Sequence, residues 1–378
     1  MKLLETTVLL FSINTKQSHH VNQSTMAPAL LFLTLATICN LSGAATLPKF
    51  SSILIFGDST VDTGNNNYVK TMFRSDHPPY GRDFPGHIPT GRFSNGKLIP
   101  DFAASILGMG DTVPPVLSPG LTDDDIRTGV CFASAGSGYD DMTTVASGAI
   151  PMYEQLELFK NYITRLKGIV GEEEAKKILG RAFIIVSSGT NDLIYNYYDI
   201  PTRRYQFNII SDYHDFLLSS LQNFVKELYN LGGRLMAIAG LPPIGCLPLQ
   251  IVTRYGSSGN LACLEDQNSD CQAYNKKLKQ LLPPLQSSLP GSRILYADIY
   301  DTLSDMVSQP QKYGFVETHK GCCGTGVVEA GSTCNKATPT CGNASQFMFW
   351  DAIHPSESAY KFLIEYLEKK LISRFNPI

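Results

Sequence analysis

Short apolar runs alternate with amphipathic stretches along most of the chain. The apolar runs are rich in β-branched and aromatic residues, and five of them predict strands: 52–56, 129–133, 182–187, 234–239 and 293–297. Each run is continuously apolar rather than alternating, which is typical of a parallel sheet covered on both faces. The alternation of such strands with helical segments predicts a doubly wound α/β fold.

The segments between the strands place apolar residues at helical spacing. They predict helices over 152–168, 172–179, 212–231, 265–281 and 356–373. The third of these should end at Gly232, which suits a C-terminal cap. The fourth should stop before Pro283 and Pro284, because proline lacks the backbone donor of a helix interior.

Polar residues follow three of the predicted strands. Ser59, the glycines Gly136 and Gly138, and Asn191 each stand just beyond an apolar run. In a doubly wound sheet, binding and catalytic groups gather beyond the carboxyl ends of the strands. The pattern therefore places three separate segments on one rim of the sheet.

Ser59 lies in ILIFGDSTVDTGNNN, residues 53–67. A serine or aspartate after a strand commonly caps the next helix. The G-x-S-x-G nucleophile elbow is absent, because Val61 stands where its second glycine would be. Taken alone, Ser59 is more typical of a helix cap than of a nucleophile.

A second segment supplies what a nucleophilic serine needs. FWDAIHPSESAY, residues 349–360, carries Asp351 three residues before His354. A serine needs a base to take its proton, and the base needs a group that holds its tautomer. Asp-x-x-His provides both, although an incidental pair on a surface loop is the alternative for these two residues alone.

Two further segments could stabilise an oxyanion. The Asn191 amide could donate to a developing negative charge, and Gly136 or Gly138 of FASAGSGYDD could present a backbone N–H to the same atom. Taken singly, Asn-Asp after a strand is more often a turn, and such glycines usually permit tight turns.

The chain has 378 residues, of which 43% are hydrophobic, and a net charge of −3 without a long basic run. That composition is typical of a globular protein with a full core. A nucleic-acid partner is not expected, because nucleic-acid-binding surfaces are strongly basic.

The N-terminal region resembles a targeting segment. An apolar stretch over 29–41 precedes three small residues at 43–45, which predicts a secretory signal cleaved near Ala45. The stretch is too short for a transmembrane helix. We therefore expect 1–45 to be an extension plus signal peptide, with the start at Met1 or at Met26, and 46–378 to be one domain.

Eight cysteines follow this signal: Cys131, Cys246, Cys263, Cys271, Cys322, Cys323, Cys334 and Cys341. An even number in a secreted chain favours disulfides. Cys322 and Cys323 are adjacent and should pair with different partners, while the connectivity stays open. Asn343 begins an Asn-Ala-Ser glycosylation sequon in the same region.

Three other motifs have plainer explanations. GRFSNGKL resembles a phosphate-binding loop, but Leu98 stands where Ser or Thr would bind magnesium. TDDDIR, 122–127, lacks the glycine and distal glutamate of a calcium loop and is interpreted as a solvated helix start. IYNYYDI, 194–200, could line an acyl pocket or pack at a surface turn.

Four histidines without a partner at ligand spacing are expected to be structural or exposed: His77, His87, His214 and His319.

Seven ordered segments together carry a family resemblance: FGDSTVDTGNNN, TGRFSNG, FASAGSGYDD, GTND, GLPPIGCLP, KGCCGTG and FWDAIHPSESAY. In order and spacing they resemble the plant GDSL esterase/lipase family of the SGNH hydrolases, and most of all its extracellular-lipase group. The resemblance covers nearly all of the chain beyond the signal. It implies a flavodoxin-like, three-layer α/β/α fold with a central, mostly five-stranded parallel sheet.

The resemblance also implies roles for individual residues. Ser59 would be the nucleophile, His354 its base and Asp351 the group that orients the base. The oxyanion donors would be the Ser59 backbone N–H, the Gly138 N–H and the Asn191 side chain. Gly138 is chosen because the family pattern keeps a glycine there more strictly than two residues earlier.

The implied reaction is hydrolysis of a small-molecule or lipid ester through an acyl-serine, without metal or organic cofactor. The protein would be a monomer located outside the cell or in the cell wall. Two rival functions remain open. One is an acyltransferase that passes the same acyl group to an alcohol, and the other is a non-catalytic secreted protein that binds lipid or glycan.

Two cysteines depart from the family pattern. Cys131 stands where the family usually has Asn or Ser, and Cys271 is additional to the usual set. These two cysteines could form an extra disulfide, which requires Cα atoms no more than about 7 Å apart.

Overall fold

A four-stranded parallel sheet forms the core of the computed structural model, which describes residues 49–145, 147–200, 202–256 and 261–375. The strands pair in the order β1 (Ile53–Gly57), β2 (Phe183–Ser187), β3 (Leu235–Ala239) and β4 (Arg293–Ala297). Four of the five predicted strands are thus confirmed, each within one residue of its expected bounds. The predicted signal peptide lies outside the described residues.

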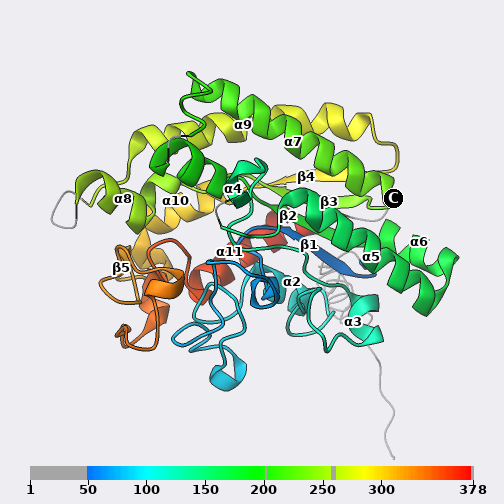
Figure 1. Cartoon of the computed structure of the whole chain (residues 1–378), viewed down its shortest axis with the longest axis horizontal. Coiled ribbons are helices and arrows are strands. Elements are labelled where there is room, and N and C mark those ends of the chain that lie inside the picture. The colour runs from blue at the N-terminus through cyan, green and yellow to red at the C-terminus, as the bar shows by residue number, and fades with distance from the viewer. Residues whose placement is uncertain (1–48, 146, 201, 257–260, 376–378) are drawn as a thin grey trace, which may run out of the picture. The chain divides into compact units, whose positions relative to one another are not determined.

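Helices cover both faces of this sheet (Figure 1). One face packs against α5 (Met152–Val170), α7 (Ile210–Asn230) and α9 (Glu265–Ser287), and the other against α2 (Ile99–Ile106), α10 (Tyr300–Ser308) and α11 (Glu357–Lys370). Four further helices are α3 (Asp123–Thr128), α4 (Met142–Val145), α6 (Glu172–Gly180) and α8 (Pro248–Tyr255). This is the expected three-layer α/β/α arrangement.

The fifth predicted strand, 129–133, is wrong as a regular strand. Only Cys131 forms isolated parallel bridges, one to Ile55 of β1 and one to Pro115. Gly129, with φ +118°, begins the extended stretch, and a turn closed by Ser137 N donating to Ser134 O follows it. The stretch is therefore too short for a ladder, although its backbone still pairs with the edge of β1.

This partial strand fixes the topology. Counted along the chain, the extended segments lie in the spatial order 2-1-3-4-5, because 129–133 flanks β1 on the side away from β2. That is the flavodoxin-like order, and its switch point lies between β1 and β2. The fold therefore predicts that a site should form where these two strands end.

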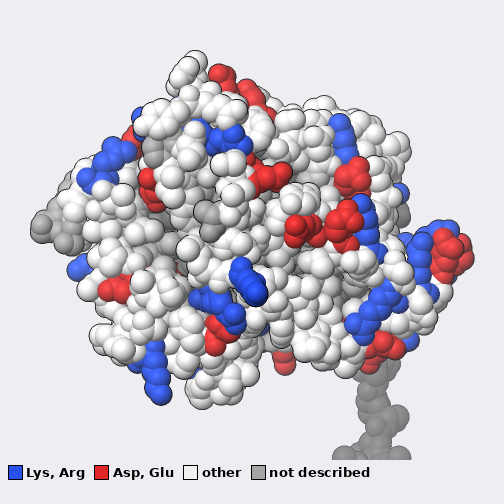
Figure 2. Space-filling model, viewed as in Figure 1, with Lys and Arg blue, Asp and Glu red and all other residues white. Residues whose placement is uncertain are grey.

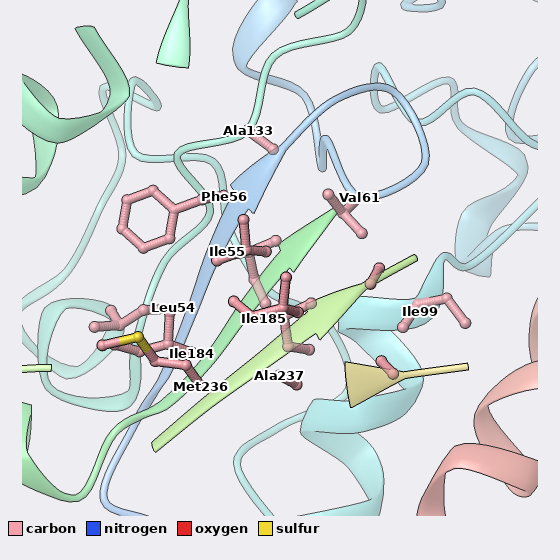
Figure 3. Close-up of a cluster of buried hydrophobic side chains, with 14 of the residues drawn as sticks. Leu54, Ile55, Phe56, Val61, Ile99, Ala133, Ile184, Ile185, Met236 and Ala237 are labelled. Atoms are coloured by element: carbon pink, nitrogen blue, oxygen red, sulfur yellow. The ribbon is translucent and has the colours of Figure 1, made fainter. Parts of the chain in front are cut away.

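Side chains alternate between the two faces along each strand (Figure 3). Phe56 points toward the α5 and α7 side, where its ring centroid lies 5.4 Å from that of Phe159 and 5.6 Å from that of Phe224. Ile185 and Ala237 point toward the side of α11. Both faces of the sheet are consequently apolar, as the continuous hydrophobic runs indicated.

Helix α9 contradicts the expected stop before its prolines. It continues through Pro283 and Pro284 to Ser287. Both prolines are exposed, so the carbonyl groups that lose a helical donor can bind water instead. Leu282 and Leu285 are buried on the opposite side, so packing holds the helix together where propensity alone would end it.

A second, two-stranded parallel sheet consists of β5 (Glu317–Gly321) and β6 (Phe347–Phe349). No pattern in the sequence predicted it. Two disulfides, Cys322–Cys341 and Cys323–Cys334, lie in the segment between β5 and β6. A third disulfide, Cys246–Cys263, closes a loop elsewhere in the chain. The adjacent cysteines thus pair with different partners, as predicted.

The proposed extra disulfide is wrong. Cys131 and Cys271 are both free and buried. The Cys131 thiol lies 3.3 Å from the Val61 carbonyl oxygen, where it donates a hydrogen bond. Burial raises the pKa of each thiol to about 12, so neither is expected to react at neutral pH.

Charged residues of both signs are interspersed on the face shown in Figure 2. Among the described residues visible there, neither sign forms a continuous field, which agrees with the small net charge. Within the described ranges, no helix combines the length and the hydropathy that crossing a membrane requires.

His214 gives the fold a predicted acid sensitivity. Its side chain, on α7, is 1% exposed, and neither ring nitrogen has a hydrogen-bond partner among the described residues. Burial, with a smaller effect of Lys277, lowers its pKa from 6.5 to about 4. Between pH 6.5 and pH 4, His214 is protonated in the unfolded chain but stays neutral in the folded protein. The free energy of unfolding should therefore decrease by about 3 kcal/mol as the pH drops from 6.5 toward 4.

Urea unfolding at pH 7 and pH 4.5 checks this expectation. His214→Phe should lose part of the acid destabilisation, because it cannot be protonated and keeps an aromatic ring against Tyr274. His87→Phe is the matched control at an exposed position. An unchanged pH dependence in the His214 variant would contradict the account.

Candidate active site

Ser59 lies on a tight turn that follows β1. Gly57 ends the strand with φ +139°, and a Cβ there would meet the Ser187 carbonyl oxygen of β2 at 1.8 Å, so only glycine fits. Asp58 then fixes the turn, because its carboxylate accepts hydrogen bonds from the backbone N–H and the hydroxyl of Thr60, at 3.0 and 2.8 Å. The backbone thus presents Ser59 at the end of the strand.

The hydroxyl of Ser59 faces His354 and caps no helix. The next helix, the 3₁₀ turn Asn65–Tyr68, has no side-chain cap, so the helix-cap interpretation is wrong. Ser59 Oγ lies 2.9 Å from His354 Nε2, and His354 Nδ1 lies 2.8 and 2.9 Å from the two carboxylate oxygens of Asp351. A carboxylate only accepts, so Nδ1 carries the proton and Nε2 is left to accept from the serine.

Asp351 is fully buried and surrounded by donors. Besides the imidazole, it accepts hydrogen bonds from the backbone N–H groups of Ile353 (2.8 Å) and His354 (2.7 Å) and from the Tyr80 hydroxyl (2.6 Å). These bonds offset the cost of burying the carboxylate. Burial and the nearby Asp351 raise the pKa of Tyr80 well above its usual range, so Tyr80 stays a donor.

Tyr80 is a site residue that the sequence analysis missed. Its oxygen also accepts a hydrogen bond from Gly331 N at 2.7 Å, and it thereby connects Asp351 to the cysteine-rich segment. No local pattern distinguishes it from the other tyrosines of the chain. Its role comes from a contact 271 residues away in sequence.

The small sheet positions the loop that carries Asp351 and His354. This loop follows β6 directly, and Gly321 of β5 packs against it so closely that a Cβ would lie 2.5 Å from the Asp351 backbone. The ring of Phe93 stacks at a tilt against the imidazole, with centroids 4.7 Å apart. These contacts restrict the imidazole to one orientation.

The polar residues after Ser59 connect its turn to the 131–135 segment. Asn65 Nδ2 donates to the carbonyl oxygens of Cys131 (2.9 Å) and Ala133 (2.8 Å). Asp62 accepts from Ala135 N at 3.0 Å, and Asn66 Nδ2 donates to Ala135 O at 2.9 Å. The polar residues of FGDSTVDTGNNN therefore hold the 131–135 segment, which precedes Gly136, against the turn that carries Ser59.

Asn191 and Gly136 border the same space as Ser59. Both line a cleft with Ser59 and His354, and one Asn191 N–H donates to Ser137 O at 2.9 Å, which fixes the amide. Gly138 packs against Asp192, since a Cβ there would meet the Asp192 carboxylate at 2.1 Å. Gly136 therefore borders the cleft together with the serine, whereas the role of Gly138 as an oxyanion donor stays a prediction.

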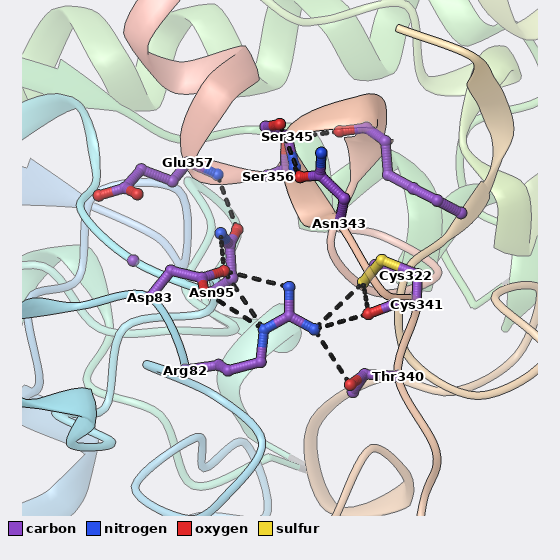
Figure 4. Close-up of polar contacts among 12 residues, drawn as sticks. Arg82, Asp83, Asn95, Cys322, Thr340, Cys341, Asn343, Ser345, Ser356 and Glu357 are labelled. Atoms are coloured by element: carbon purple, nitrogen blue, oxygen red, sulfur yellow. Dashed lines mark hydrogen bonds and ion pairs between the residues drawn. A yellow bond between two sulfur atoms is a disulfide. The ribbon is translucent and has the colours of Figure 1, made fainter.

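A polar network supports the cysteine-rich side of the site (Figure 4). Arg82 donates to Cys341 O at 2.9 Å and pairs with Asp83 at 3.2 Å. Asn95 Nδ2 donates to Asp83 at 2.8 Å, while Asn95 Oδ1 accepts from Glu357 N at 2.8 Å. The start of α11, just after His354, is thus tied to the disulfide-bonded segment.

Asn343, the asparagine of the sequon, lies on the surface of the same segment. It is exposed, and its Oδ1 accepts hydrogen bonds from the backbone N–H and the hydroxyl of Ser345, at 3.0 and 2.7 Å. The side chain is therefore accessible to a modifying enzyme.

Two cavities meet at Ser59. The outer cleft is bordered by Met72, Phe73, Tyr195 and the Gly331 segment. The inner cavity leads from Ser59, Asn191 and His354 to the space between the sheet and α11. Of the clustered tyrosines at 194–200, Tyr195 lines the outer cleft and stacks on Phe73, whereas Tyr197 is packed against Tyr213.

Other candidate sites fit their plainer explanations. Asp123–Thr128 is a helix that starts with a capping box between Thr122 and Asp125. Across the described ranges, no group of three or more His, Cys, Asp or Glu side chains is arranged to hold a metal ion.

Comparison with known proteins gives one consistent result. Residues 53–367 match the family model described as GDSL-like Lipase/Acylhydrolase. In Arabidopsis thaliana, the GDSL esterase/lipase At2g31550 is 51% identical over 349 residues, which cover 91% of this chain and 97% of that protein. GDSL esterase/lipase At1g58430 is 52% identical, with 90% and 96% covered, and GDSL esterase/lipase At2g40250 is 43% identical, with 90% and 95% covered.

Proposed function

The chain belongs to the family of GDSL-like lipases and acylhydrolases and is a carboxylic ester hydrolase, and from this premise we propose that it is a secreted serine esterase acting on lipid-type esters through an acyl-Ser59 intermediate. Ser59 would be the nucleophile, His354 the base and Asp351 the group that orients the base. The observation that carries the proposal is the continuous hydrogen-bonded chain from Ser59 Oγ to the buried Asp351 carboxylate.

In the first half of the reaction, Ser59 Oγ attacks the ester carbonyl carbon. Its proton moves to His354 Nε2, and the imidazolium is stabilised by the Asp351 carboxylate. When the tetrahedral intermediate collapses, the bond from carbon to the alcohol oxygen breaks, and Nε2 returns the proton to that oxygen. The alcohol leaves, and the acyl group stays on Ser59.

In the second half, water replaces the alcohol. His354 Nε2 takes a proton from the water, and the resulting hydroxide attacks the acyl-serine carbonyl. Collapse breaks the bond to Ser59 Oγ, which regains its proton from Nε2, and the acid is released. Both tetrahedral oxyanions would accept hydrogen bonds from the backbone N–H groups of Ser59 and of Gly136 or Gly138 and from the Asn191 amide.

Product balance with p-nitrophenyl butyrate tests this function. The purified protein should release p-nitrophenol and butyric acid in equal amounts, measured by absorbance and by pH-stat titration. The same balance with added glycerol tests the acyltransferase alternative, since butyryl glycerol would then replace the acid. A folded protein that turns over no ester would instead be the binding protein.

Secretion is supported by the signal pattern before residue 46, by the three disulfides and by the exposed Asn343. Expression in a eukaryotic secretory host tests it. The protein should reach the medium with an N-terminus near residue 46 and should lose mass on endoglycosidase treatment, whereas Asn343→Gln should not. Retention inside the cell with residues 26–45 intact would contradict secretion.

Asn191→Ala is expected to lower kcat by about 10²- to 10³-fold, because one donor to the oxyanion is lost. KM should change little, since the amide acts mainly on charge that develops in the transition state. Steady-state kinetics with p-nitrophenyl butyrate check this. Asn230→Ala, at the exposed end of α7, is the control, and equal effects of both substitutions would argue against the assignment.

A further inference from the structure

The inner cavity at Ser59 extends along the whole length of β2. Ser59 and His354 lie at one end, where the strands finish, and Phe183, the first residue of β2, lines the other end together with Leu371 and Ile372. The polar residues of the lining gather at the Ser59 end, and the lining beyond them is apolar. We call this cavity the inner channel.

The sequence of β3 leaves room for the inner channel. On the face toward α11, this strand carries Leu235 at its start and then the small Ala237 and Ala239, whereas Met236 and Ile238 point to the other face. In the neighbouring strand β4, Ala297 is likewise small and lines the channel. Small side chains on adjacent strands leave space between the sheet and the helix.

Residual exposure in the middle of the sheet agrees with an open channel. Ile185 lies in a central strand with helices over both faces, yet it is 8% exposed, while its neighbours Ile184 and Val186 are 0% exposed. Ile185 is the one of the three that lines the channel. The exposed area of Ile185 therefore faces an internal space rather than solvent outside the protein.

Helix α11 closes the other side with an apolar stripe. Its residues along the channel are Tyr360, Leu363, Ile364 and Leu367, and Leu371 follows directly after its end. Their spacing places them on one face of the helix. The channel is thus bounded by apolar side chains from the sheet and the helix and opens to polar groups only at the serine.

We propose that the inner channel holds the acyl chain of a long-chain ester, while the outer cleft holds the alcohol. This inference rests on the proposed function, since it takes Ser59 as the attacking group. An apolar channel favours methylene groups, each buried methylene improving binding about fourfold. The outer cleft suits the alcohol, because it borders His354, as the inner channel also does, and in addition includes the polar Ser332.

The length of β2 sets the expected chain length. Its four residue steps from Phe183 to Ser187 span about 13 Å. An extended chain advances roughly 1.2 Å per bond, so the length of the channel matches that of an acyl group of about 12 carbons. The ratio kcat/KM should therefore rise from acetate to about dodecanoate.

Enlarging the two alanines of β3 tests the inference. Ala237→Leu should block the channel midway, and Ala239→Leu should block it nearer Ser59. Because the two positions are about 7 Å apart along the strand, the longest accepted chain should be shorter in the Ala239 variant by roughly six carbons. Ala175→Leu, a buried alanine of α6 away from the channel, should leave the chain-length profile unchanged.

The readout is kcat/KM for p-nitrophenyl esters from acetate to palmitate. Retained acetate hydrolysis with at least a tenfold loss on dodecanoate in the Ala237 variant supports the inner channel. If this variant does not fold, Leu371→Phe at the far end of the channel should lower kcat/KM only for the esters with the longest acyl chains. Wild-type hydrolysis that does not increase with chain length, or variants with the wild-type profile, would overturn this inference and leave the esterase intact. No hydrolysis of any ester would overturn the proposed function and this inference with it.

Discussion

Ser59→Ala is expected to lower kcat for ester hydrolysis by about 10⁶-fold, the order found when a serine nucleophile is removed from a triad. Without Oγ no acyl-enzyme can form, and the remaining rate comes from binding and from oxyanion stabilisation alone. The fold should be unaffected, because within the described part of the chain Ser59 Oγ forms a hydrogen bond only with His354. Stopped assays with p-nitrophenyl butyrate at high enzyme concentration measure the difference.

Ser188→Ala is the matched control for this substitution. Ser188 also lies just beyond a strand at the same rim, is 4% exposed, and its hydroxyl has no hydrogen-bond partner among the described residues. Its removal should change kcat by less than about threefold, since it takes no part in the proposed reaction. If Ser59→Ala retained a tenth of the wild-type rate, Ser59 would not be the nucleophile.

Asp351→Asn is expected to lower kcat by about 10⁴-fold. The amide keeps the shape of the carboxylate, and its oxygen in the place of Oδ1 can still accept from the backbone N–H groups of Ile353 and His354, while its NH₂ group takes the place of Oδ2 beside the Tyr80 hydroxyl. Its NH₂ group, however, donates toward His354 Nδ1, which forces the ring proton onto Nε2. In that tautomer the imidazole cannot accept the proton of Ser59.

The same substitution at Asp124, an exposed residue of α3, is the control and should leave kcat unchanged. Thermal unfolding should show that Asp351→Asn remains folded. A kcat within tenfold of the wild type would mean that Asp351 does not set the tautomer of His354, and would leave only a structural role for this carboxylate.

The sheet could be predicted because its side chains are apolar on both faces. Continuous runs such as FIIVS bury every apolar residue, and this requirement is visible in the sequence without knowledge of contacts. The partial strand at 129–133 was misjudged because strand length depends on the partner, and only Cys131 finds partners on both sides. The end of α9 was misjudged because proline is tolerated where the freed carbonyl groups face water.

The site was predictable where chemistry limits the residue type. A base and its orienting carboxylate three residues apart can be recognised in a sequence, whereas the supports of that pair cannot. Tyr80 reaches Asp351 only through the fold. The side-chain amide of Gln155, on α5, is also close to Gly57 only through the fold. It accepts a hydrogen bond from Gly57 N–H and donates one to the Gly57 carbonyl oxygen, each at 2.9 Å. Spacing alone does not distinguish Gly136, which borders the cleft, from Gly138.

Covalent labelling with a fluorophosphonate ester tests the central claim most directly. The reagent reacts with a serine only when a neighbouring base activates it, so intact-mass and peptide analysis should find one adduct, on Ser59, formed in proportion to the loss of esterase activity. His354→Ala should abolish the labelling. An enzyme that keeps its activity without an adduct on Ser59, or loses it through an adduct on another residue, would contradict the account.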